Sequence, residues 1–183
     1  MALYIILGII VLTVLYFISI YNGFVSLKAK IDAAWSDIDV QLKRRSDLIP
    51  ALVNTVKGYT KYEKSTLEDV IKARAISQKA STLKERAEAE NMISQALGKI
   101  FALAEAYPDL KANTTFLKLQ EELSNIEEAL QNARRYYNAV VRDYNAKIES
   151  FPDLIIAKKF NFTPREYFEL EDEKAREMPK IDL

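Results

Sequence analysis

The sequence predicts an all-α protein, with an N-terminal transmembrane helix followed by a four-helix up-and-down bundle of long helices. The first twenty-seven residues contain no Asp, Glu, Lys or Arg. Helix breakers are scarce, with four Gly and five Pro among 183 residues. Beyond the apolar start, two stretches carry apolar residues at alternating spacings of three and four, the heptad period of packed helices. No stretch has the alternation of a half-buried strand.

We expect three parts: a transmembrane anchor over 1–27, a helical bundle over 28–160 and an acidic C-terminal tail over 161–183. At about 1.5 Å per residue, the run from Leu3 to Tyr21 is long enough to cross a hydrocarbon core of about 30 Å. A cleavable signal peptide needs a basic start and a small-residue cleavage site, and the first residues supply neither. The sequence therefore predicts an uncleaved anchor.

The lysines beside the anchor predict its orientation. No basic residue precedes the span, whereas Lys28 and Lys30 follow it directly. Positive charges favour the cytoplasmic side, so we expect a single-pass protein of the cell membrane with its N-terminus outside and its C-terminal domain in the cytoplasm. The alternative is the inverted orientation.

A first long helix is predicted after the anchor. Its buried stripe is Ile31, Trp35, Ile38, Leu42, Arg45, Ile49, Leu52, Val56 and Tyr59. The stripe keeps its phase across Pro50, which favours a kink or a tightened turn over a loop.

A second stripe predicts the last long helix. It comprises Phe116, Leu119, Leu123, Ile126, Leu130, Ala133, Tyr137, Val140 and Tyr144. Two weaker helical stretches, 64–78 and 82–107, lie between the long helices, with turns expected at 58–62 and 80–82.

An aromatic-Pro-Asp-Leu phrase occurs at 107–110 and again at 151–154. Proline disfavours helical geometry in the preceding aromatic residue, and Asp can cap a following helix, so we expect each phrase to end one helix and start another. The second phrase predicts a short helix near 154–159. The tail beyond it either packs on the bundle through Phe162, Tyr167 and Phe168 or is mobile.

The composition excludes most catalytic and metal chemistry. With neither Cys nor His, the chain lacks thiolate nucleophiles, His-based triads and the usual zinc ligands. We expect no enzyme, no cofactor and no metal site. The formal net charge is zero, which gives no field to recruit nucleic acid.

Five polar residues form the candidate site: Arg44, Arg45 and Asp47 on the first long helix, with Arg134 and Arg135 on the last. Guanidinium groups bind phosphate or carboxylate well, so one interpretation is an anion-binding surface. The other is structural. Arg45 interrupts an apolar stripe, which favours a buried pair with an acid from another helix, such as Glu105 or Glu121, that fixes the register of the bundle.

A family resemblance is carried by several segments: Trp35 to Arg45, Asp47 to Pro50, Val56 to Tyr59, Ala96 to Gly98, Leu103 to Asn113, Phe116 to Leu123, Ala133 to Asn138, Tyr144-Asn145, Phe151-Pro152 and Pro164 to Phe168. These segments resemble the LemA family. The resemblance covers nearly the whole chain and implies a short membrane helix with a four-helix bundle. It implies no established biochemical activity. Ser46 departs from the family pattern, which often has His there.

Two functions follow from these observations. The first is a non-catalytic interaction or scaffold module at the membrane; the alternative is a small-anion or ligand sensor that uses the Arg cluster. The expected partners are the lipid bilayer, through residues 3–21, and a protein, such as another membrane protein. No nucleic-acid partner is expected, and homo-oligomerisation is left open.

Overall fold

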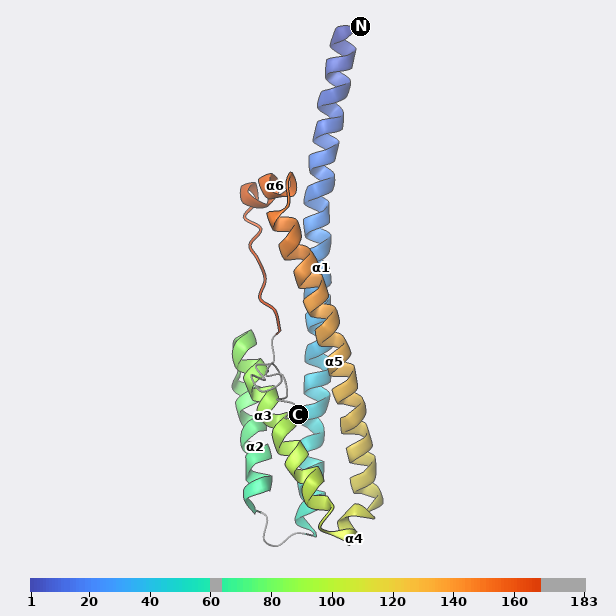
Figure 1. The fold of residues 1–183 in the computed structure, drawn as a ribbon, viewed down its shortest axis with the longest axis vertical. Coiled ribbons are helices and arrows are strands. Elements are labelled where there is room, and N and C mark those ends of the chain that lie inside the picture. The colour runs from blue at the N-terminus through green and yellow to red at the C-terminus, as the bar shows by residue number, and fades with distance from the viewer. Residues whose placement is uncertain (60–63, 169–183) are drawn as a thin grey trace, which may run out of the picture. The chain divides into compact units, whose positions relative to one another are not determined.

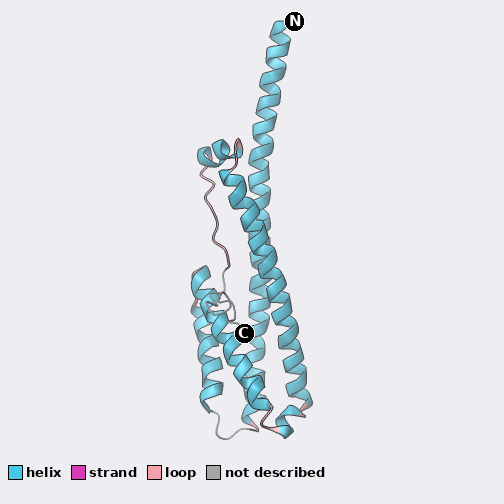
Figure 2. Cartoon of the chain, viewed as in Figure 1, coloured by secondary structure: helices cyan, strands magenta, loops and turns pink. Residues whose placement is uncertain are grey.

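The computed structural model describes residues 1–59 and 64–168, and every regular element in those ranges is a helix (Figures 1 and 2). The helices are α1 (Ala2–Lys57), α2 (Lys64–Lys79), α3 (Leu83–Ala104), α4 (Pro108–Lys111), α5 (Thr114–Glu149) and α6 (Asp153–Lys159). The all-α prediction is confirmed. The expected turn at 58–62 is described only for Gly58 and Tyr59, and its remaining residues lie outside the described ranges.

Helix α1 runs without a break through both the expected anchor boundary at 27/28 and Pro50. The anchor and the first long helix of the sequence prediction are therefore one helix of 56 residues. No loop interrupts the helix at Pro50, in agreement with the unbroken phase of the stripe.

The start of α3 is fixed by a capping box. Thr82 Oγ1 accepts a hydrogen bond from the Glu85 backbone N–H, and the Glu85 carboxylate accepts one from the Thr82 backbone N–H. The same carboxylate also accepts from the Ser81 N–H and hydroxyl. These contacts satisfy amides that would otherwise be free at a helix start, and they lower the pKa of Glu85, chiefly through the Ser81 N–H.

The aromatic-Pro-Asp-Leu phrases do separate helices: α4 begins at Pro108 and α6 at Asp153. Neither α4 nor α6 has a side-chain hydrogen bond at its N-cap, so the capping role expected of the Asp residues is wrong. Asp153 is ion-paired with Lys147 instead. The first turn of α5 is instead capped by Asn113, whose Oδ1 accepts a hydrogen bond from the Phe116 N–H.

The chain forms two compact units, which we describe separately. Unit 1 comprises residues 1–40 and 131–167; the described residues of unit 2 are 41–59, 64–130 and Phe168. Both α1 and α5 contribute to each unit.

Unit 2 has a continuous apolar core to which α1, α2, α3, α4 and α5 all contribute. Its fully buried members include Leu52 and Val56 of α1, Val70 of α2, Ile100 of α3 and Leu110 of α4. The first stripe is buried from Ile31 to Val56, apart from Trp35, which is half-buried; Tyr59 at its end is 39% exposed, because the helix has already ended there.

In unit 1, α1 packs against the C-terminal half of α5 through aromatic side chains. The Phe24 and Tyr144 rings meet edge to face at 6.0 Å, and the Trp35 and Tyr137 rings meet at 5.9 Å. A Cβ at Gly23 would lie 3.2 Å from Lys147 Cε, so a side chain there would crowd α5.

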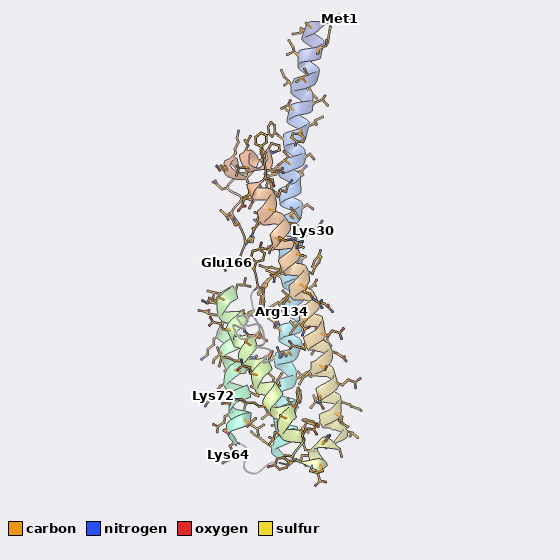
Figure 3. The ribbon with its side chains drawn as sticks, viewed as in Figure 1. Met1, Lys30, Lys64, Lys72, Arg134 and Glu166 are labelled. Carbon is orange, nitrogen blue, oxygen red and sulfur yellow. The ribbon has the colours of Figure 1, made fainter. Side chains whose placement is uncertain are left out.

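A segment without helix or strand, residues 161–167, returns along α1 and α5; we call it the strap (Figure 3). Phe162 stacks on Phe24 with ring centroids 4.8 Å apart. The Asn145 side chain hydrogen-bonds both the N–H and the carbonyl of Arg165, each at 2.9 Å. Tyr137 donates its hydroxyl to the Glu166 carbonyl at 3.1 Å. The first part of the expected tail is therefore packed on unit 1, whereas 169–183 lie outside the described residues.

The second stripe needs one correction. Arg134, not Ala133, is buried, with 6% of its surface exposed. Residues 126, 130, 134, 137, 141, 144 and 148 of α5 are all buried, so the stripe steps by four where alternation predicts three. An α-helix has 3.6 residues per turn, and the buried face of a long helix drifts away from a strict heptad.

The start of α1 extends beyond α6 without any covering element (Figure 1). Residues 2–19 are exposed apart from Phe17, which is half-buried, and Ile20 is the first buried side chain. Among the described helices, α1 is the one long and apolar enough to cross a membrane.

Candidate functional site

Arg45 is the central residue of a buried polar cluster in unit 2. Its side chain is 4% exposed, although it lies in an apolar stripe of α1. One guanidinium nitrogen lies 3.5 Å from Glu90 Oε2 of α3. The other donates a hydrogen bond of 2.8 Å to Ser94 Oγ and lies 2.9 Å from Glu127 Oε2 of α5. Arg45 therefore ties α1 to both α3 and α5.

The contact between Arg45 and Glu127 is an ion pair without a hydrogen bond, unlike the contacts of Arg45 with Glu90 and Ser94. The atoms are close enough for an ion pair, but the Glu127 oxygen makes no hydrogen bond of acceptable geometry. It is a Coulombic contact at the edge of the cluster, since a third of the Glu127 side chain reaches solvent.

Glu90 is the most deeply buried acid of the cluster, with 1% of its side chain exposed. Its second oxygen accepts a hydrogen bond of 2.5 Å from Ser77 Oγ of α2. A buried carboxylate is costly unless paired and hydrogen-bonded, and here both conditions are met. The cluster thus joins four helices: α1 through Arg45, α2 through Ser77, α3 through Glu90 and α5 through Glu127.

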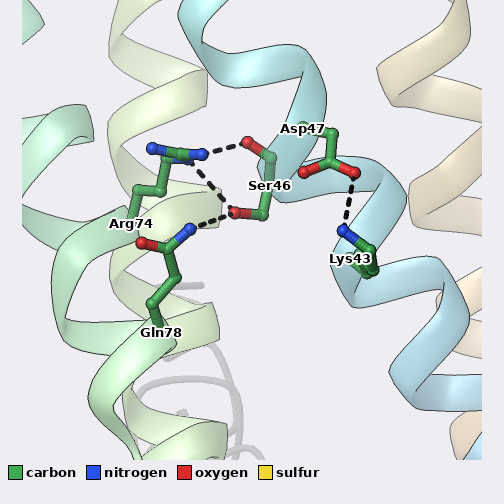
Figure 4. A network of polar contacts seen from close by, with 5 residues as sticks. All are labelled: Lys43, Ser46, Asp47, Arg74 and Gln78. Carbon is green, nitrogen blue, oxygen red and sulfur yellow. Dashed lines mark hydrogen bonds and ion pairs between the residues drawn. The ribbon is translucent and has the colours of Figure 1, made fainter.

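A second polar network lies one residue further along α1 (Figure 4). The Arg74 Nε–H of α2 is shared between the Ser46 carbonyl, at 2.8 Å, and Ser46 Oγ, at 3.2 Å. Gln78 also reaches Ser46 Oγ, at 3.4 Å. Ser46 therefore acts as a hydrogen-bond acceptor that links α1 to α2.

Beside the Arg45 cluster lies a groove of about 570 Å³ between α3 and α5. Its apolar wall includes Leu97, Phe101 and Leu117, and its polar lining includes Ser94, Gln120, Glu121, Ser124 and Glu127. A Cβ built at Gly98 would meet nothing within 4 Å, so this glycine leaves open space in the groove.

The charge around the groove is negative. Among the described residues, Arg45 is the one basic side chain that lines it, whereas Glu121 and Glu127 line it as acids and Glu90 lies behind Arg45. One guanidinium therefore faces three carboxylates. A free anion would meet a cation that is already engaged and two further negative charges, so the groove is poorly suited to phosphate or carboxylate ligands.

The five predicted site residues do not form one cluster. Arg44 is exposed and lies 3.9 Å from Glu122, and Asp47 is exposed and lies 3.2 Å from Lys43. Neither contributes to the Arg45 cluster. Arg134 and Arg135 belong to unit 1, where Arg134 is buried and Arg135 is exposed, with hydrogen bonds to Gln131 and Asn132 of its own helix.

The expected acid partners of Arg45 are wrong. Glu105 lies at the C-terminal end of α3 and pairs with Lys111 instead, and Glu121 lines the groove without an ion pair to Arg45. Arg45 pairs with Glu90 because α3 runs parallel to α1 and its first half, not its end, lies beside Arg45 (Figure 1). Helix α5 places Glu127, not Glu121, within reach of the guanidinium.

Glu90 and Ser77 were missed by sequence reasoning, yet a signal for Glu90 exists. The α3 stripe Ile93, Leu97, Ile100 and Ala104 extends back by three residues to Glu90. An acid within an apolar stripe is the same signal that identified Arg45. Two opposite charges, each interrupting the stripe of a different helix, are natural partners.

Two tyrosines of unit 1 have a perturbed ionisation. Burial raises the pKa of Tyr137, with the nearby Arg165 acting in the opposite direction, and burial also raises the pKa of Tyr144. Both hydroxyls therefore stay protonated at neutral pH, and that of Tyr137 donates to the strap.

The described residues hold no group of three or more Asp or Glu side chains placed to bind a metal ion.

The chain is similar to several known proteins. The chain is 25% identical to Protein LemA of Metamycoplasma hominis over 183 residues, which cover 98% of this chain and 81% of that protein. It is also 25% identical to Magnetosome protein MamQ 1 of Paramagnetospirillum magneticum and 24% identical to Magnetosome protein MamQ of Magnetospirillum gryphiswaldense. The latter two matches cover 81% of this chain but 64% of each relative.

The comparison with protein-family models agrees with these relatives. The model of the LemA family matches residues 34–183, which include the second half of α1, the Arg45 cluster, the groove and the strap. This match extends over most of the chain, and the likeness to Protein LemA agrees with it. The chain belongs to the LemA family.

Proposed function

We propose that this protein is a non-catalytic interaction module of the cell membrane. The first segment of α1 crosses the bilayer, and the helical units lie on the cytoplasmic side. The observation that carries the proposal is the bare, uncharged start of α1, which continues directly into a helix packed in both units. Lys28 and Lys30, both exposed just beyond the span, support the cytoplasmic orientation.

The groove of unit 2 is the surface we assign to a protein partner. Its apolar wall, with Leu117 47% exposed, offers area for burial, and its excess of carboxylates selects for positive charge. The expected occupant is a partner segment that carries a Lys or Arg side chain beside apolar residues. Gly98 allows the backbone of such a segment to approach closely.

The anion-sensor alternative is less well supported. Arg45 is the residue on which that function depends, and its guanidinium is occupied by Ser94, Glu90 and Glu127. Releasing it to bind an anion would leave Glu90 buried without its cation, which costs several kcal/mol.

The proposal is tested with a variant whose side chain fills the groove. Gly98→Phe adds an aromatic side chain where there is open space, and it also removes a helix-interior glycine, so the melting temperature should not fall. A photo-crosslinking residue at Leu117 should capture a specific protein in intact cells. We expect Gly98→Phe to abolish the adduct and Glu121→Lys to reduce it.

The matched control is Gln95→Phe, which adds the same ring to an exposed position of α3 outside the groove. This variant should leave the adduct unchanged. An adduct that survives both Gly98→Phe and Glu121→Lys would show that the partner does not occupy the groove.

A further inference from the structure

The turn between α5 and α6, together with α6 itself, presents apolar side chains to solvent. Phe151 is 81% exposed, Ile155 is 48% exposed and Phe160 is 50% exposed. These three residues fall within a segment of ten residues, and no described element of unit 1 buries them, although the Phe160 ring contacts Tyr21 of α1. We call residues 151–160 the α6 tip.

The position of the α6 tip along α1 is fixed by direct contacts within unit 1. The Phe160 ring meets the Tyr21 ring at 4.8 Å, and the Phe162 ring meets that of Tyr21 at 5.7 Å. Tyr21 is the last residue of the apolar run, and Ile20 is the first buried side chain of α1. The α6 tip therefore lies where the bare part of α1 ends.

The length of the uncovered start of α1 is consistent with a membrane surface at the position of Tyr21 and the α6 tip. Residues 2–19 of α1 extend about 27 Å, close to the thickness of a hydrocarbon core of about 30 Å. If this stretch spans the bilayer, Tyr21 stands at the interface, where tyrosines are enriched. The α6 tip is then at the depth of the lipid headgroups.

The charges of the α6 tip fit a lipid surface. Asp153 is paired with Lys147, so its charge is compensated. Lys158 and Lys159 follow at the end of α6, and both are exposed, as are Lys28 and Lys30 of α1. Glu149, at the end of α5, is the exposed acid nearby in the sequence. Exposed lysines beside exposed aromatic and aliphatic residues are typical of segments that lie in the interface of anionic membranes.

We propose that the α6 tip is a second membrane contact, in which Phe151, Ile155 and Phe160 enter the headgroup region and Lys158 and Lys159 bind anionic lipids. The proposal rests on the anchoring role of α1 proposed above. Two contacts, one spanning and one interfacial, would hold unit 1 in a defined orientation to the bilayer, because a single helix alone leaves rotation about its axis free.

The absence of Cys from the sequence allows a direct test in the full chain. Single variants Phe151→Cys and Ile155→Cys carry an environment-sensitive fluorophore, in vesicles of phosphatidylcholine mixed with phosphatidylglycerol. The vesicles contain lipids with nitroxide groups at the headgroup and along the acyl chain, which quench a fluorophore in the headgroup region or in the hydrocarbon core. Leu12→Cys reports on the anchor, and Val40→Cys is the matched control, since Val40 is 53% exposed on α1 about 28 Å beyond Tyr21.

We expect strong quenching at positions 151 and 155, at least about half of that at position 12, and none at position 40. Replacing Lys158 and Lys159 together by Gln should reduce quenching at position 155 in the anionic vesicles and leave it unchanged in phosphatidylcholine alone. Quenching that is insensitive to both the lysines and the lipid charge would overturn the assignment of Lys158 and Lys159 to anionic lipid.

Quenching at position 12 without quenching at 151 and 155 would overturn the interfacial contact and leave the anchor in place, as expected if a protein or a second copy covers the α6 tip. Absence of quenching at position 12 would instead contradict the anchor itself. The two failures are therefore distinguishable.

Discussion

Arg45 and Glu90 form an ion pair in the interior of unit 2, each in the apolar stripe of its own helix. Such pairs add little net stability, because the cost of removing two charges from water offsets their attraction. The pair instead destabilises other registers of the two helices. Sliding α3 along α1 by one turn would leave both charges buried without a partner. The pair therefore favours a single register for these helices.

Arg45→Leu should destabilise the protein strongly. The change leaves Glu90 buried without its cation, at a cost of about 3–5 kcal/mol. Arg45→Leu combined with Glu90→Leu should recover most of this loss, because Glu127 reaches solvent and tolerates the loss of Arg45. Thermal melts followed by circular dichroism in detergent measure both variants. A single variant as stable as the wild type would refute the structural role of Arg45.

The neighbouring arginines provide the comparison. Arg44→Ala and Arg135→Ala remove exposed guanidinium groups whose contacts lie on the surface, so each should change the free energy of unfolding by under about 0.5 kcal/mol. If Arg44→Ala or Arg135→Ala lowered the free energy of unfolding as much as Arg45→Leu, burial would not explain the importance of Arg45.

At this scale the sequence identified Arg45 as a buried, paired residue but named the wrong partners. A polar residue within an apolar stripe is visible in a single sequence, and Glu90 satisfies the same criterion. Which acid meets Arg45 depends on how far α3 is shifted along α1, and that shift is set by the turns and the core packing. Glu105, at the end of α3, and Glu121, on α5, lie at positions along their helices that do not pair with Arg45.

Among the elements, α5 shows why a heptad is a good but incomplete guide. The alternation predicted burial correctly from Phe116 to Leu130, and again at Tyr137, Val140 and Tyr144. It failed at Ala133, where the face of the helix had drifted and Arg134 took the buried position. The strap was not predictable from periodicity, because residues 161–167 form no regular element and are held by side chains such as Asn145.

The start of α3 is a second element whose stability can be tested. Thr82→Ala removes the N-cap acceptor and should cost about 1 kcal/mol. Glu85→Ala should also destabilise at neutral pH. Because the pKa of Glu85 is lowered in the folded state, its contribution is present above the ordinary value of 4.5 and is lost as the pH falls through the folded pKa.

Melts of Glu85→Ala and the wild type at pH 7 and in acid measure this dependence. The difference between them should shrink as the solution is acidified below pH 4.5. The matched control is Glu128→Ala, an exposed acid of α5, which should change stability little at neutral pH. A difference for Glu85→Ala that stays constant with pH would show that the capping box does not depend on the carboxylate charge.

For the whole molecule, the central feature is the single helix α1. The start of α1 is uncharged and uncovered, and its remainder is packed in both units. The all-α class and the helix positions were predictable because breakers are scarce and the stripes are regular. The continuity of α1 was not, because a change in composition at Lys28 resembles a boundary although nothing there ends a helix.

The proposed cytoplasmic module is tested most directly by measuring on which side of the membrane the helical units lie. Met92 is 44% exposed on α3, and Met92→Cys provides a single labelling site in a chain without Cys. In intact cells a membrane-impermeant maleimide should leave this variant unlabelled, and permeabilisation should expose it, with the protein remaining in the membrane fraction after alkaline extraction. Labelling in intact cells, or release of the protein by alkaline extraction, would contradict a cytoplasmic module anchored by α1.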